Sequence, residues 1–338
     1  MKVVGLETIR LNEYPSILFL QVHTDEGIIG LGENCVGVES VETFIHESIA
    51  PRILGKDPLE INALHETLHQ DFIGYSGSSI AVRATSSIDI ALWDIFGQAV
   101  GKPIYQLLGG KVRDKIRAYN TCAGTGYAKG SSNIDRKRAS QLGVVTDGDY
   151  EDLFAFLNKP EELVHSLKEM GFTAMKIWPF DEAAIRAGGQ TVMGKDLHEG
   201  VDIFRRAREA AGSDFDIMLE MHSMWSVPAA TVIAHAVEEY SPFWIEDPFR
   251  HESTDALVRF KQSINSPLTT GETTGTRWDH HRLLKSNAID HLMIDPGWVG
   301  GITEARQVIG LASTYEVPVA PHDCTGPVVL TVGTHLGV

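Results

Sequence analysis

Three glutamates in the second half of the chain have a spacing that could build a metal site. Glu220, Glu246 and Glu272 each follow a short apolar stretch and lie 26 residues apart in both intervals. One strand-and-helix unit separates each pair, and in a barrel of such units the carboxyl ends of successive strands converge on one mouth. Three carboxylates there would repel one another unless a cation held them, and hard oxygen ligands favour Mg²⁺ over zinc. The spacing therefore predicts a magnesium site, although any one glutamate alone could instead cap a helix or form an ion pair.

Other strand ends carry groups that could move a proton. Asp295 and His322 follow the next two expected strands, so the carboxylate could orient the imidazole and raise its basicity, as a general base requires. Lys176 ends an earlier strand across the mouth, where its ammonium could hold a substrate carboxylate or, with a lowered pKa, act as a base. His222 lies two residues beyond Glu220, on the same side of an extended strand, and could protonate a departing hydroxyl. The alternatives are a structural role for His322, since the chain has 14 histidines, and a surface position for Lys176.

The elements that must position these residues are strands and helices in alternation. From residue 116 onward, short apolar runs alternate with amphipathic helical patterns, which indicates a parallel sheet. Seven runs are candidate strands: IRAYNT, TAMKIW, DIMLEM, FWIED, LTTGE, IDHLMID and VPVAPH. Between the first two, residues 124–149 are polar and rich in Gly and Ser. This stretch is too long for an ordinary connection, and we expect a lid or binding loop.

The N-terminal part has a different pattern. ILFLQVHTDEGIIGLGEN contains two β-rich runs joined by residues 25–27, a plausible hairpin turn. Residues 41–101 have helical spacing, and Gly101 with Pro103 ends the helix. A chain of 338 residues suits a barrel of about 250 residues with a smaller attached domain. We therefore expect an α+β domain over residues 1–115 and a barrel domain over residues 116–338.

Composition limits the classes of partner. The net charge is −16, and Asp and Glu outnumber Lys and Arg 45 to 29, which disfavours a nucleic-acid surface. The N-terminus lacks the apolar stretch of a signal peptide, and no run of about 18 apolar residues suggests a membrane span. Three scattered cysteines fit neither a disulfide framework nor a CxxC site. We expect a cytoplasmic protein, a homo-oligomer, that acts on a small molecule and binds neither nucleic acid nor membrane.

Longer motifs carry a family resemblance over nearly the whole chain. They are GLGEN (30–34), SSIDIALWDIFGQAVGKPIYQLLGG (86–110), WIEDPF (244–249), GETTG (271–275), DPGWVGGITEA (295–305) and PVAPHD (318–323). With them the chain resembles the mandelate racemase branch of the enolase superfamily. The resemblance implies a modified (β/α) TIM-type barrel with an N-terminal α+β capping domain, Mg²⁺ on the three glutamates, and an enediolate formed from a carboxylate substrate. The metal would neutralise charge that builds on the carboxylate oxygens as the alpha proton leaves.

Two features narrow the reaction that the resemblance implies. Racemases of this family carry Lys-x-Lys on the second strand, with the second lysine as a base, whereas this chain has Lys176-Ile177-Trp178. Racemisation needs bases on both faces of the alpha carbon, so one-base chemistry with His322 remains. His222 stands where sugar-acid dehydratases of the family are similar in keeping a histidine as general acid. The resemblance thus points to elimination from an aldonate or aldarate: His322 removes the C2 proton and His222 protonates the leaving C3 hydroxyl, giving a 2-keto-3-deoxy sugar acid.

Candidate substrate contacts are Trp178 and four residues of the long loop, namely Tyr127, Arg136, Arg138 and Tyr150. Surface exposure is the alternative for the four loop residues. Two other functions stay open. One is a racemase, epimerase or lactone cycloisomerase of the same branch, and the other is a non-catalytic metabolite-binding protein on an inherited barrel.

Family members continue past the histidine-bearing strand into an eighth strand and a tail that returns to the capping domain. This chain ends 16 residues after His322. We therefore expect the sequence to lack the eighth strand and the C-terminal tail.

Overall fold

The computed structural model describes residues 1–69, 79–124, 151–324 and 326–338. Almost all of the predicted lid, together with Tyr127, Arg136, Arg138 and Tyr150, lies outside the described residues. In the described ranges, no helix combines the length and apolar character that a membrane crossing requires.

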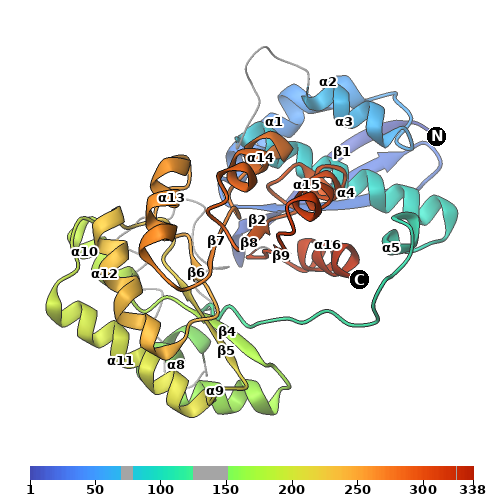
Figure 1. Cartoon of the computed structure of the whole chain (residues 1–338). Helices are drawn as coiled ribbons and strands as arrows, with labels where there is room; N and C mark the ends of the chain where they lie inside the picture. The colour runs from blue at the N-terminus through green and yellow to red at the C-terminus, as the bar shows by residue number, and fades with distance from the viewer. Residues whose placement is uncertain (70–78, 125–150, 325) are drawn as a thin grey trace.

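The first part of the chain forms an antiparallel sheet covered by helices (Figure 1). Its strands, β1 (Val3–Leu11), β2 (Tyr14–Thr24) and β3 (Ile29–Cys35), pair in chain order. The hairpin prediction is confirmed: the Thr24 N–H donates to the Ile28 carbonyl at 3.0 Å, and Gly27 takes the left-handed conformation with a φ of 81°. The helices are α1 (Val38–Phe44), the π-helix η1 (Ile45–Ile49), α2 (Ala50–Ile53), α3 (Ile61–His69), α4 (Ile80–Val100) and α5 (Ile104–Leu107).

The longest of these helices, α4, packs directly on β3. It ends as predicted at Gly101, whose φ of 65° is the left-handed conformation typical of a helix end. Two glycines of the GLGEN motif permit the close contact, because a Cβ on Gly30 or Gly32 would lie 2.1 Å from the backbone oxygen of Ala91 or Ser87. The motif therefore encodes the contact between strand and helix.

Replacing Gly32 with alanine is expected to destabilise the protein by about 2–3 kcal/mol, because neither the helix nor the strand backbone can give way cheaply. The midpoint of urea unfolding measures the loss. Gly5→Ala is the matched control in β1, since its Cβ would meet only the His23 Cβ at 3.9 Å. Its effect should stay below about 1 kcal/mol. Equal stability of the Gly32 variant and the parent would contradict the packing argument.

The second part of the chain curls a parallel sheet into a partial barrel with helices outside (Figure 1). Among the described residues, six strands pair in chain order: β4 (Ala174–Ile177), β5 (Asp216–Glu220), β6 (Ile245–Glu246), β7 (Leu268–Thr270), β8 (His291–Ile294) and β9 (Val319–Pro321). The helices are α8 (Asp152–Asn158), α9 (Pro160–Glu169), α10 (Asp181–Ala187), α11 (Gly194–Ala211), α12 (Val227–Val237), the 3₁₀ helix η2 (Glu238–Tyr240), α13 (Thr254–Ser263), α14 (Thr276–Ser286), α15 (Gly301–Thr314) and α16 (Pro327–Gly337). The expected α/β class, a barrel with an α+β cap, is confirmed, whereas the division after residue 115 stays a prediction.

Of the seven predicted strands, the first was wrong. IRAYNT makes only a single bridge, between Asn120 and Met175. The Asn120 N–H donates to the Ala174 carbonyl, and its own carbonyl accepts from the Lys176 N–H. Cys122 then has a φ of 54°, so the extended conformation does not continue beyond Thr121.

Polar contacts join the cap to the barrel on two sides. Helix α4 meets α15, where the Trp93 indole donates to the Thr303 hydroxyl at 2.9 Å and the Thr303 N–H donates to Asp89 at 2.9 Å. Near the last strand, the buried Glu33 of β3 accepts from the Gly326 and Val328 N–H groups, at 2.7 and 3.1 Å. Glu33 thus caps the start of α16 and supports the loop that follows β9.

Candidate active site

The three glutamates meet at the carboxyl ends of neighbouring strands. Glu220 ends β5 and Glu246 ends β6, and the two are register partners. Both are fully buried, and Glu272, two residues beyond β7, has a side chain that is only 13% exposed. Each glutamate offers an oxygen within 4.8 Å of those of the other two. Strand alternation explains the inward direction, because Met218 and Trp244, two residues before the first two glutamates, pack together on the same inner face.

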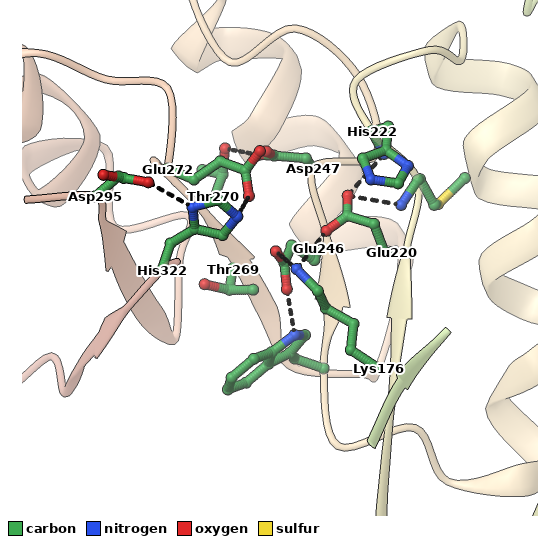
Figure 2. A network of polar contacts seen from close by, with 12 residues as sticks. Lys176, Glu220, His222, Glu246, Asp247, Thr269, Thr270, Glu272, Asp295 and His322 are labelled. Atoms are coloured by element: carbon green, nitrogen blue, oxygen red, sulfur yellow. Dashed lines mark hydrogen bonds and ion pairs between the residues drawn. The ribbon is translucent and has the colours of Figure 1, made fainter. Parts of the chain in front are cut away.

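Glu220 is held as a carboxylate from two sides (Figure 2). One oxygen accepts from the Met221 and His222 N–H groups at 3.0 and 2.7 Å, and the other accepts from the Lys176 ammonium at 2.8 Å. Burial alone would raise the pKa of Glu220, but the charges of Lys176 and His222 outweigh it and leave that pKa lowered. Glu220 is therefore a charged ligand.

Lys176 lies between two of the glutamates rather than at the surface. Its side chain is buried and also donates to Glu246, whose second oxygen accepts from the Trp244 indole at 2.8 Å. Burial lowers the pKa of Lys176, yet Glu220 and Glu246 raise it well above its ordinary value. The surface alternative was wrong, whereas the two roles considered for Lys176 stay predictions. Burial and the neighbouring carboxylate of Glu220 raise the pKa of Glu246.

This donor set fits a hard divalent cation. Two of the carboxylates, Glu220 and Glu246, already hold a positive charge, the Lys176 ammonium. Mg²⁺ would be held by Glu220, Glu246 and Glu272, with water or substrate oxygens as further ligands.

His322 and Asp295 form the dyad that the strand order suggested. His322 directly follows β9, and its Nδ1 lies 2.9 Å from the Asp295 carboxylate, which also accepts from the Gly297 N–H at 2.7 Å. Its Nε2 lies 3.0 Å from Glu272. Burial lowers the pKa of His322, but Glu272 and Asp295 raise it to about 10. Glu272 makes the largest raising contribution, and its charge is the one that a bound cation would share.

An aromatic ring of the barrel and a cationic group of the cap complete the surroundings of this dyad. The Trp298 ring lies 5.5 Å from the His322 ring, and the Arg83 guanidinium of α4 stacks over Trp298 at 4.2 Å. Arg83 also donates to the Cys35 carbonyl at 3.2 Å. Sequence reasoning missed Trp298 and Arg83, although both lie in or beside the quoted motifs. The cap therefore helps to hold the base.

His222 reaches the site by a turn. The prediction that His222 lies on the same side of an extended strand as Glu220 was wrong, because β5 ends at Glu220 and His222 has a φ of 46°. Its Nδ1 lies 2.8 Å from Asp181, and its ring meets the edge of Trp178 at 5.4 Å. Burial lowers the pKa of His222, but Asp181 and Glu220 raise it to about 9. Sequence reasoning missed Asp181; its place after the strand that carries Lys176 was the available signal.

Asp247 is a second carboxylate that sequence reasoning missed. It follows Glu246 with a φ of 41°, is buried, and accepts a hydrogen bond from the Thr270 hydroxyl (Figure 2). Burial and the nearby Glu272 raise the pKa of Asp247. The WIEDPF motif, in which the two acidic residues are adjacent, was the signal. The contact with Thr270 ties the end of β6 to β7 beside the glutamates.

Comparisons with known families agree over most of the chain. A family model described as enolase C-terminal domain-like matches residues 160–338. A second model, the N-terminal domain of mandelate racemase and muconate lactonizing enzyme, matches residues 8–109. The two matches include every glutamate and histidine discussed above.

Solved bacterial structures resemble the chain as well. An enolase of the mandelate racemase subgroup from Agrobacterium tumefaciens is 43% identical, with a TM-score of 0.86, and the match covers 99% of this chain and 82% of that one. A candidate dehydratase from Salmonella typhimurium is 28% identical, with a TM-score of 0.86 and coverage of 99% and 84%. A candidate galactarate dehydratase from Agrobacterium radiobacter, with bound sodium and L-malate, is 27% identical, with a TM-score of 0.80 and coverage of 99% and 77%.

Proposed function

We propose that this chain catalyses the Mg²⁺-dependent dehydration of a sugar acid. The chain belongs to the mandelate racemase and muconate lactonizing enzyme family of the enolase superfamily. Members of this superfamily are enzymes that generally use a divalent metal, and two of the similar structures are candidate dehydratases. The substrate class is an aldonate or aldarate, and the product is the 2-keto-3-deoxy acid. A cytoplasmic location and a homo-oligomeric state belong to the same proposal.

One observation carries the proposal: a histidine paired with a carboxylate stands on each side of the glutamate cluster. Figure 2 shows His322 with Asp295 on one side of the glutamates and His222 on the other. His322 with Asp295 comes from the last strand ends, and His222 with Asp181 from the first. Elimination needs this arrangement, because one group takes a proton from C2 while another gives a proton to the oxygen that leaves C3.

The steps follow from the positions of these side chains. Glu220, Glu246 and Glu272 would hold a divalent cation, which would supply positive charge to the carboxylate of the substrate when the alpha proton is removed. Asp295 fixes the His322 tautomer, so that Nε2 faces the mouth and takes the C2 proton. The C3–O bond then breaks, and the hydroxyl leaves as water with a proton from His222. The enol that remains becomes the 2-keto acid when C3 gains a proton.

Racemisation and epimerisation receive less support from the same contacts. They require a second base across the alpha carbon, yet Lys176 is engaged with Glu220 and Glu246. Trp178, at the position of the family's second lysine, packs against His222. A lone base with a neighbouring acid fits elimination better.

The test is incubation of the protein with Mg²⁺ and a panel of aldonic and aldaric acids, followed by assay of 2-keto acids. We expect at least one acid to give product. Exchange of the alpha hydrogen in D₂O without any keto acid would favour the racemase or cycloisomerase alternative. Binding of an acid with neither exchange nor product would favour the metabolite-binding alternative.

Replacing His222 with asparagine should separate the two halves of the reaction. Keto-acid formation is expected to fall by about 10²- to 10⁴-fold, because the hydroxyl loses its proton donor, while exchange of the C2 proton into D₂O continues. NMR of the substrate measures both processes in one sample. Parallel loss of exchange and elimination would show that His222 is not specifically the acid.

A further inference from the structure

A second cluster of possible metal ligands, separate from the glutamates, joins α3 of the cap to α15 of the barrel. His65 and His69 stand one turn apart on α3, so their rings share one face of the helix. Glu304 comes from the first turn of α15. One ligand atom from each of the three lies within 4.8 Å of the others. We propose that His65, His69 and Glu304 form a zinc site that joins the two parts of the protein.

The tautomer of His69 leaves a nitrogen lone pair available. Its Nδ1 lies 3.0 Å from the His65 carbonyl, and a carbonyl oxygen can only accept, so Nδ1 carries the proton. Nε2 is therefore the unprotonated nitrogen. This atom is buried and has no hydrogen-bond partner among the residues that the structure describes. A buried acceptor without a donor is costly, and a metal ion would satisfy it.

The distance between the other two ligands also suits zinc. His65 Nε2 lies 3.2 Å from a Glu304 oxygen. Two ligand atoms about 2.0–2.1 Å from a tetrahedral zinc ion are themselves about 3.3 Å apart. Zinc can therefore replace the proton between these two atoms with little movement of either side chain. The rings of His65 and His69 are already adjacent, with centroids 4.0 Å apart.

His69 and Glu304 are hydrogen-bonded through an atom that does not face the metal, as is usual at metal sites. The Asp89 carboxylate lies 3.4 Å from His65 Nδ1, and His69 uses Nδ1 on the backbone. One oxygen of Glu304 accepts from the Arg277 N–H and Nε–H at 2.6 and 3.0 Å, and the Arg277 guanidinium also lies 2.9 Å from the oxygen that faces His65. His69 and Glu304 are thus oriented before any metal arrives, and zinc would share the second Glu304 oxygen with Arg277.

The ligand types distinguish this site from the glutamate cluster. Two imidazoles and one carboxylate suit zinc, whereas three carboxylates suit Mg²⁺. The competing account is a metal-free ion pair, in which a protonated His65 lies between the carboxylates of Asp89 and Glu304. The two accounts differ in the role of His69: it is a ligand in the zinc site, whereas the metal-free ion pair does not involve it.

The test uses the whole chain after chelation, reloaded with excess Mg²⁺ so that the glutamates are occupied. Zinc is then titrated by calorimetry, and cobalt(II) is bound in its place for visible spectroscopy. We expect one zinc ion per chain, a higher melting temperature with zinc, and a cobalt spectrum with nitrogen ligands. Glu246→Gln should keep this binding, since it alters only the other site.

His69→Ala and His69→Gln should weaken zinc binding at least about 10-fold and remove the thermal shift. His198→Ala is the matched control, because His198 is an exposed histidine of α11. Circular dichroism of the metal-free variants checks that they fold. If the parent binds no zinc in excess Mg²⁺, or if both His69 variants bind it as the parent does, the metal-free ion pair is the correct account.

Discussion

Replacing His322 with asparagine is expected to lower turnover on the order of 10³-fold or more. The asparagine amide can still donate to Asp295, and it can keep the packing against Trp298, but it cannot take the C2 proton. Exchange of the alpha hydrogen into D₂O should fall together with keto-acid formation, because both begin with the same proton transfer. This joint loss distinguishes the base from the acid, whose variant should retain exchange.

The control for this variant is an asparagine at the exposed His198, which should leave both rates unchanged. Binding of the substrate acid should also survive in the His322 variant, since the glutamates are untouched. Rapid exchange in the His322 variant would show that another residue removes the C2 proton. Lys176 would then be the next residue to replace, despite its contacts with two carboxylates.

Removing the metal or one of its ligands should have an effect of similar size. After chelation the parent is expected to lose turnover, and Mg²⁺ should restore it. Glu246→Gln should lower turnover by more than about 10²-fold even with Mg²⁺, because a neutral amide weakens the cation site and leaves Lys176 with one carboxylate fewer. Calorimetric titration with Mg²⁺ measures the affinity directly.

Glu169→Gln is the matched control for this charge change, since Glu169 is exposed at the end of α9. It should bind Mg²⁺ and turn over as the parent does. If the Glu246 variant showed the same Mg²⁺ dependence as the parent, the glutamate cluster would not be the catalytic metal site.

The parts of the site that could be predicted follow the repeat of strand and helix. Even spacing placed Glu220, Glu246 and Glu272 together, because the residues at or just after the end of each strand converge on the same mouth. The same logic placed His322 beside Asp295. These predictions needed only strand ends and their order, which apolar runs reveal.

The parts that could not be predicted depend on backbone turns and distant contacts. His222 and Asp247 have positive φ values just past their strands, and no alternation rule describes such turns. Arg83 reaches the dyad through Trp298, from a helix more than 200 residues earlier in the chain. Asp181 contacts His222 because the segments that follow the neighbouring strands β4 and β5 meet.

The contact between Glu33 and the start of α16 also affects when the site can form. Glu33 and Gly326 are 293 residues apart in the chain. At about 5–20 residues per second, a ribosome needs on the order of 15–60 s to make the intervening segment. Glu33 in the N-terminal sheet cannot contact the start of α16 until this segment has been synthesised. Contacts between residues so far apart in the sequence also slow folding in general. The loop that carries His322 is therefore expected to become ordered late in synthesis, after the strands that carry the glutamates.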